Sequence, residues 1–160
     1  MSQLKYKDKS EYTFLDVVNA PGPATAMIFI SIVTLGTGFI IWLPAVTTFT
    51  PNNPSWDWLR SHGGESLWGP VINTVGVLCM TSTWLYVHYV RSVYKKLVTD
   101  DKRRAPRRYA RFAFQIVAPM WICLAGSFLL NNPTSLGSFI YVCIGALAQW
   151  VSLRLRRNVE

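Results

Sequence analysis

The chain is too apolar for an ordinary soluble domain of its length. Of its 160 residues, 51% are hydrophobic and only 15% are charged, against about 25% charged residues in a typical soluble domain. The length suits a single domain, and the net charge is +8. The three cysteines lie inside apolar runs and form no CxxC pair, which argues against a disulfide framework or a zinc site.

Charged residues are missing from three long stretches. No Asp, Glu, Lys or Arg occurs in residues 17–56, 66–90 or 112–153. A membrane-spanning helix needs about 20 apolar residues, so each stretch can hold one span and the last can hold two. The sequence therefore predicts an all-α integral membrane bundle of four transmembrane helices, forming a single membrane domain over residues 1–160.

The first span is predicted over residues 24–43. Pro21, Gly22 and Pro23 precede it and Pro44 follows it, and these residues break helices. Its apolar run is longer than the 7–15 residues typical of a signal peptide. We therefore expect a retained helix.

The other spans are predicted over residues 67–90, 112–130 and 135–153. Ser66 is a candidate N-cap for the second span, with Pro70 in its first turn. The segment Asn131-Asn132-Pro133-Thr134 is a turn of helix-stopping residues, so the third and fourth spans should form a tight antiparallel hairpin.

The distribution of Lys and Arg predicts the topology. From the N-terminal tail to the C-terminal tail, the five segments outside the spans carry 3, 1, 9, 0 and 3 basic residues. Loops on the cytoplasmic side are enriched in Lys and Arg. We expect both termini and the basic loop, residues 91–111, on the cytoplasmic or equivalent side.

The basic loop holds nine Lys and Arg against two Asp, interleaved with aromatic residues. In a soluble protein this composition would suggest a nucleic-acid groove, but between two spans it is a topology signal, and we expect no nucleic-acid partner. Ala105-Pro106 is expected to divide the loop into two helical extensions. The surplus charge is suited to anionic lipid headgroups or another membrane subunit. The candidate lipid- or partner-binding residues are Lys95, Lys96, Lys102, Arg103, Arg104, Arg107, Arg108 and Arg111.

The tryptophans fit membrane interfaces, where amphipathic rings collect. An aromatic belt at the outer ends of spans one and two is the simplest interpretation of Trp42, Trp56, Trp58 and Trp68, and Trp150 lies near the inner end of span four.

No Asp, Glu, Lys or Arg lies within a predicted span, and His88 is the one histidine there. An ionisable group there is a candidate functional residue. It could be an axial ligand to haem or chlorophyll, or a hydrogen-bond donor to quinone. The alternative is an interfacial histidine that faces headgroups or a neighbouring helix. His62, the other histidine, is predicted on the opposite side, so the two cannot clamp one haem.

Uncharged polar and small residues interrupt the spans. Each amide of Asn73, Gln115 and Gln149 needs a partner in hydrocarbon, which another helix can supply. Pro119 should kink the third span. The small residues of TLGTG, 34–38, and of Gly145-Ala146 with Ala148 would permit close helix packing.

The outer loop, residues 44–66, contains a possible catalytic or metal-binding set. Asp57, Arg60, His62 and Glu65 are the candidates, but their spacing matches no ligand motif. The alternative is a structured loop shaped by its Pro and Gly residues.

Two classes of function remain. The first is a non-catalytic accessory or assembly subunit of a larger membrane complex, such as an electron-transfer, photosynthetic or respiratory assembly. The lack of intramembrane carboxylates and lysines favours it over a proton pump or cation-coupled transporter. The second is a small membrane enzyme or carrier acting on a lipid or quinone, in a groove near His88, Gln115 and Pro119.

Overall fold

Four long helices make up most of the molecule. The computed structural model describes residues 23–43, 56–94, 104–131 and 136–157, which are almost entirely helical and include no strand. Each long helix contains a stretch long and apolar enough to cross a membrane. The all-α, four-span fold predicted from the sequence is confirmed, and the chain is a multi-pass membrane protein. The helices are α2 (Ala24–Trp42), α4 (Gly64–Tyr94), α5 (Arg104–Asn131) and α6 (Leu136–Arg157), with a short α3 (Asp57–Ser61) before α4.

Three of the helices, α4, α5 and α6, extend beyond the predicted spans at their polar ends. α4 begins three residues before the predicted start, so Ser66 is not its N-cap; the Ser66 hydroxyl donates to the Gly63 carbonyl oxygen at 3.1 Å. α5 begins at Arg104, which places Pro106 in its first turn instead of at a break. Proline is tolerated there because a first-turn N–H has no intrahelical partner. The apolar stretches therefore indicate which segments can cross the membrane, but they do not mark the ends of α4, α5 and α6.

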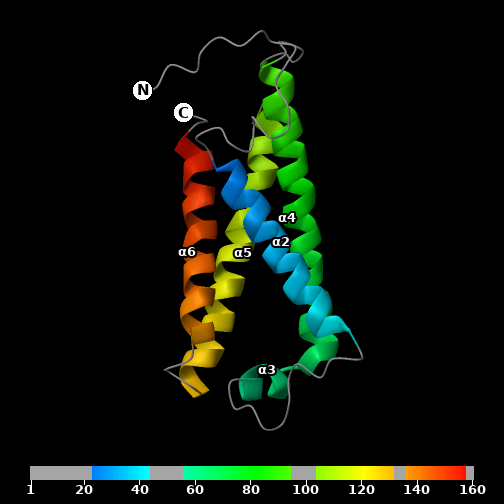
Figure 1. Cartoon of the computed structure of the whole chain (residues 1–160), viewed down its shortest axis with the longest axis vertical. Coiled ribbons are helices and arrows are strands. Elements are labelled where there is room, and N and C mark those ends of the chain that lie inside the picture. The colour runs from blue at the N-terminus through cyan, green and yellow to red at the C-terminus, as the bar shows by residue number, and fades with distance from the viewer. Residues whose placement is uncertain (1–22, 44–55, 95–103, 132–135, 158–160) are drawn as a thin grey trace.

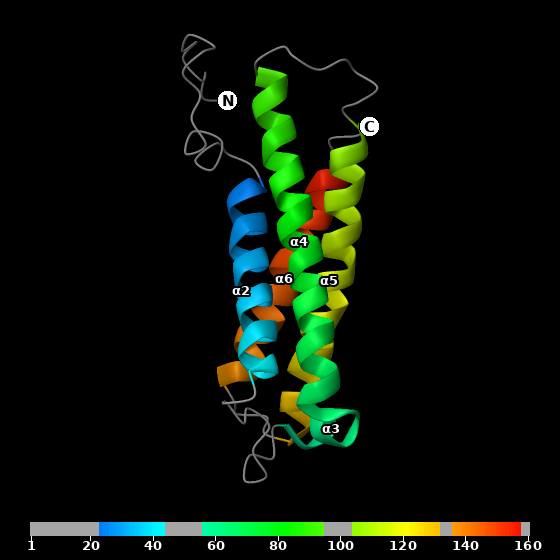
Figure 2. The same ribbon diagram turned by 90° about the vertical axis from the view of Figure 1, so that its right-hand side faces the viewer.

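The four helices run alternately up and down along the long axis (Figures 1 and 2). The start of α2, the end of α4, the start of α5 and the end of α6 therefore lie at one end, called here the basic end. α3 lies at the opposite end (Figure 1). α2 packs mainly on α4 and α5 mainly on α6, while α4 and α5 join the two pairs and α2 touches α6 only marginally.

Glycines allow α2 and α4 to approach very closely. A Cβ atom at Gly38 would lie 2.4 Å from the backbone nitrogen of Asn73, and one at Gly76 would lie 2.6 Å from Cα of Leu35. Neither position has room for a side chain. The predicted role of the TLGTG segment is thus confirmed at Gly38, but a Cβ at Gly36 would meet nothing within 4 Å.

The α5–α6 pair has a similar close contact. A Cβ atom at Gly145 would lie 3.2 Å from the carbonyl oxygen of Ala118. Ala148, one turn further along α6, is fully buried, whereas Ala146 is exposed. α5 continues as a helix through Pro119, whose side chain is exposed. Two of the three small residues predicted here therefore serve packing.

A glycine pair makes the sharp turn between α3 and α4. Gly63 and Gly64 have φ angles of 108° and 59°. These left-handed values are strained for residues with a side chain, so the pair lets α3 fold back beside the start of α4.

Candidate functional sites

Two side-chain contacts link polar groups of different helices inside the bundle. The Ser31 hydroxyl of α2 donates to the Met27 carbonyl oxygen at 2.7 Å and lies 3.0 Å from the Thr83 hydroxyl of α4. The indole N–H of Trp121 on α5 donates to Thr34 Oγ1 on α2 at 3.0 Å. All five of these residues are buried. Such bonds fix the helices relative to one another.

A line of aromatic rings closes the end of the bundle near α3. Trp56 meets Phe128 edge to face at 4.5 Å between ring centroids, and Phe128 meets Tyr141 at 5.1 Å. Tyr141 in turn lies 5.1 Å from Trp121. Trp56 is only 9% exposed, so its prediction as an aromatic-belt residue is wrong: it packs into the helix bundle instead.

The other three tryptophans at the α3 end of the bundle lie at its surface. Trp42 is 57% exposed at the end of α2, and Trp58 is 36% exposed on α3. The Trp68 indole N–H donates to the His62 carbonyl oxygen at 3.0 Å. These three residues have the placement expected of an interfacial belt.

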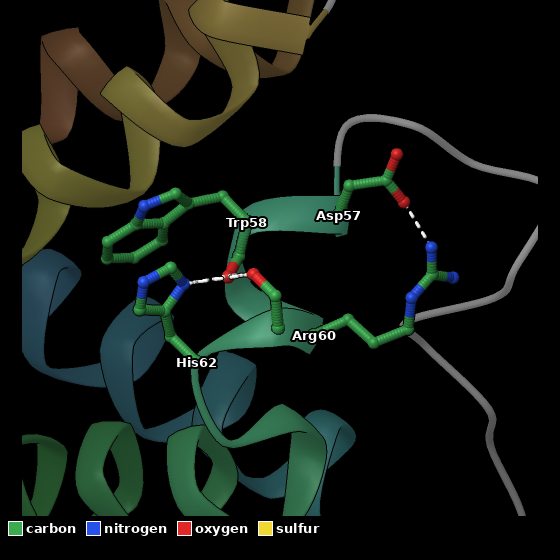
Figure 3. A network of polar contacts seen from close by, with 5 residues as sticks. Asp57, Trp58, Arg60 and His62 are labelled. Carbon is green, nitrogen blue, oxygen red and sulfur yellow. Dashed lines mark hydrogen bonds and ion pairs between the residues drawn. The ribbon is translucent and has the colours of Figure 1, made fainter.

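The polar residues of α3 and the neighbouring His62 form a local network. Arg60 is ion-paired with Asp57 one turn away, and Figure 3 shows this pair pointing away from the imidazole of His62. Nδ1 of His62 donates to the Trp58 carbonyl oxygen at 2.8 Å, and the His62 ring stacks on Trp58 at 4.5 Å. Among the described residues no group of three or more His, Cys, Asp and Glu could hold a metal ion. The contacts fit the structured-loop interpretation.

His88 lies on the outer surface of α4 near the basic end. Its ring stacks on Trp84 at 5.5 Å with an interplanar angle of 13°, and Trp84 is 62% exposed. His62 is near the opposite end of the molecule, about 26 residues earlier, so the two histidines cannot share a cofactor. A haem, chlorophyll or quinone at His88 would have to be bound on the outside of the bundle.

The groove considered for a lipid or quinone enzyme is not assembled. Cys79 Sγ of α4 lies 3.8 Å from the Ala113 carbonyl oxygen of α5. These two residues are therefore at about the same height along the long axis of the bundle. His88 is nine residues beyond Cys79, and Gln115 lies two residues from Ala113 in the other direction. At about 1.5 Å per residue, His88 and Gln115 are roughly 16 Å apart along the helices.

The two glutamines of the predicted spans face outward. Gln115 on α5 and Gln149 on α6 are both exposed, and neither side chain hydrogen-bonds to another residue in the described part of the chain. Gln115 lies three residues before Ala118 on α5, and Gln149 lies four residues after Gly145 on α6. Ala118 and Gly145 are in contact and both offsets run toward the basic end, so the two glutamines lie at a similar depth. Asn73 is half-buried where Gly38 meets α4.

The basic residues are described in part. Lys95, Lys96, Lys102 and Arg103 lie outside the described residues, and Arg104 is described only as the first residue of α5. Arg108 is exposed, and Arg107 and Arg111 are half-buried. On α6, the Arg154 guanidinium lies 5.6 Å over the Trp150 ring.

The buried contacts of Trp121 with Thr34 and of Ser31 with Thr83 were not predicted from the sequence. Serine, threonine and tryptophan occur throughout the spans, so composition gives no signal for which of them meet. The spacing of Gly69 and Gly76, seven residues apart on one face of α4, is the signal that could have revealed the α2–α4 contact.

The class of protein defined by these observations is a multi-pass membrane protein with four apolar helices. Comparisons with protein-family models, with curated proteins and with solved structures find no match to this chain.

Proposed function

We propose that this protein is a non-catalytic accessory or assembly subunit of a larger membrane complex. The observation that carries the proposal is the pair of outward amides, Gln115 and Gln149. An amide exposed to hydrocarbon without a hydrogen-bond partner is costly, and in membrane proteins a neighbouring helix commonly supplies the partner. Because both amides lie on the α5–α6 pair at similar depth, a second membrane protein packed there could satisfy both.

The interior supports the same role. Some of its buried polar side chains bond between helices, as Ser31 with Thr83 and Trp121 with Thr34, and no carboxylate or lysine lies within the predicted spans. A proton-relay or cation-coupled mechanism needs such groups. The bonds between helices in the interior and the two outward amides suit a protein that positions partners.

The test is gentle purification followed by identification of what co-migrates. The double variant Gln115→Leu/Gln149→Leu should lose its partner while keeping its own helical fold. Thr74→Val is the matched control, because Thr74 is exposed on α4 and its hydroxyl already donates to the Pro70 carbonyl oxygen at 2.8 Å. A wild-type protein that migrates alone as a stable monomer would contradict the proposal.

An absorption spectrum of the same fraction tests the cofactor hypothesis. A haem or chlorophyll band that disappears in His88→Ala would show that His88 binds the pigment. It would also favour an electron-transfer or photosynthetic complex over other assemblies. Turnover of a lipid or quinone by the isolated chain would instead establish the alternative, a small membrane enzyme.

The proposed topology places both termini and the basic loop on the cytoplasmic or equivalent side. The alternating helix directions support it because they put the start of α2 and the end of α6 at the basic end (Figure 1). In a cysteine-free background, a membrane-impermeant thiol reagent should label Ser61→Cys on intact cells. Arg108→Cys should react only after permeabilisation, and the reverse pattern would contradict the topology.

A further inference from the structure

The outer face of the α5–α6 pair carries two amides beside the closest contact of these helices. A Cβ atom at Gly145 would lie 3.0 Å from the Ile122 side chain and 3.2 Å from the Ala118 carbonyl oxygen. Gln115 is three residues from Ala118, and Gln149 is four residues from Gly145. Residues three or four apart lie on the same face of a helix, so both amides border this contact. Both are exposed, so they lie on its outer side.

Short side chains separate the two amides on this face. Pro119 on α5 and Ala146 on α6 directly follow the two residues in contact, and both are exposed. Because neither extends far from its backbone, another helix can approach closely here. We call the surface formed by Gln115, Pro119, Ala146 and Gln149 the amide face.

The membrane restricts how a second copy of the chain can meet this face. Two copies of one chain insert in the same direction, because the same distribution of Lys and Arg directs both. A symmetric pair therefore has its twofold axis along the membrane normal. When two amide faces meet across that axis, α5 of each copy lies against α6 of the other, and every residue keeps its depth.

This arrangement brings the glutamines together. Gln115 and Gln149 lie about 4.5 Å and about 6 Å from the level of the Ala118–Gly145 contact, both toward the basic end. Gln115 of one copy would therefore face Gln149 of the second copy, and the same pair would form again across the axis. An amide both donates and accepts hydrogen bonds, so one symmetric interface can satisfy all four side chains.

We propose that the amide face binds a second copy of this chain, in a symmetric dimer held by hydrogen bonds between Gln115 of each copy and Gln149 of the other. The inference rests on the proposed function, because it takes the two outward amides as the contact with another membrane protein and names that protein. A different partner would need matching donors and acceptors at this depth, whereas a second copy already has them.

The charge of the chain predicts how salt acts on the dimer. The formal net charge is +8 with every carboxylate counted. Arg108 is exposed seven residues before Gln115, so it lies on the same side of α5 and outside the predicted span. Two copies therefore repel one another at their polar ends, and added salt screens this repulsion. The dimer should strengthen as the salt concentration rises, whereas a complex with an acidic partner should weaken.

Cross-linking in native membranes tests the pairing. In a cysteine-free background, Gln115→Cys and Gln149→Cys chains with different tags are expressed together and oxidised with a copper catalyst. They should form a disulfide-linked dimer that carries both tags. Either variant expressed alone should cross-link much less, because identical positions lie diagonally across the twofold axis. Val77→Cys, on the exposed surface of α4, is the matched control and should give no dimer with Gln149→Cys.

The affinity of the dimer is a second readout that needs no cysteine. Energy transfer between full-length chains fused to donor and acceptor fluorophores measures dimerisation in liposomes as the protein is diluted with lipid. The dissociation constant of Gln115→Leu/Gln149→Leu should be roughly tenfold higher than that of the wild type, as expected from the loss of interhelical hydrogen bonds. Thr74→Val should dimerise as the wild type does.

Three results would overturn the inference. The first is no more cross-linking of the mixed Gln115→Cys and Gln149→Cys chains than of the Val77→Cys control. The second is equally efficient cross-linking of Gln115→Cys alone, which would indicate a different interface. The third is an affinity between copies that falls as salt is added.

The same experiments separate this inference from the accessory role. A different membrane protein that cross-links to Gln115→Cys in place of a second copy would overturn the dimer and leave the accessory role standing. A wild-type chain that is monomeric and retains no other protein would contradict both, and would assign the two amides to lipid or water.

Discussion

The indole N–H of Trp121 donates to Thr34 Oγ1 across 87 residues of sequence, at 3.0 Å. Both side chains are fully buried. The bond joins α5 to α2, two helices that belong to different helix pairs and make little other contact. It is therefore a specific link between the two halves of the bundle.

Replacing Thr34 by valine should destabilise the protein by about 1–3 kcal/mol, because it leaves the Trp121 N–H buried without an acceptor. Thr34→Ser keeps the hydroxyl and should cost less. The free energy of unfolding, measured by denaturant titration in detergent, compares the two variants. Equal stability of Thr34→Val and the wild type would contradict the role of this bond.

Adding a methyl group between α2 and α4 should be costly. Gly38→Ala would place its Cβ 2.4 Å from a backbone nitrogen, so the helices must separate. Overpacking of this kind costs about 1–3 kcal/mol. The thermal midpoint of unfolding should fall, and loss of the α2–α4 contact should appear as faster proteolysis of the intervening loop.

Gly36→Ala is the matched control for Gly38→Ala. It is two residues away on the same helix, and its Cβ would meet nothing within 4 Å. Because alanine favours helix over glycine by up to about 1 kcal/mol, this variant should be neutral or slightly stabilising. A similar loss of stability in both variants would show that the close approach at Gly38 is not the cause.

The three cysteines should differ sharply in reactivity. Cys79 is buried between α4 and α5, whereas Cys123 and Cys143 are exposed on the outside of the bundle. In detergent, N-ethylmaleimide should therefore modify two thiols quickly and the third only on unfolding. Mass spectrometry of peptides assigns the sites, and rapid modification of Cys79 would contradict the packing of α4 on α5.

Trp56 should matter more for stability than its neighbour Trp58. Trp56 is 9% exposed and packs edge to face on Phe128, whereas Trp58 is 36% exposed. Removing a buried large aromatic side chain costs about 3–5 kcal/mol. Trp56→Ala should lower the unfolding free energy by an amount in that range and Trp58→Ala by much less; equal effects would contradict the docking of Trp56 on α5.

The sequence by itself determined the number of membrane-crossing helices and their approximate positions. Charged groups are costly in hydrocarbon, so stretches such as 17–56 and 112–153 could be recognised from charge alone. The same pattern could not locate the helix ends. Arg104–Arg111 and Arg91 are polar but continue their helices, since helix formation depends on the backbone and not on the boundary of the apolar layer.

Only the tertiary structure decided which residues face inward. Lipid is as apolar as the protein interior, so hydrophobic spacing does not distinguish the two faces of a membrane helix. Gly38 and Gly36 look alike in the sequence, yet only one meets α4; Trp56 and Trp58 look alike, yet only one is buried. Side-chain contacts between helices distant in sequence, such as Trp121 with Thr34, made that distinction.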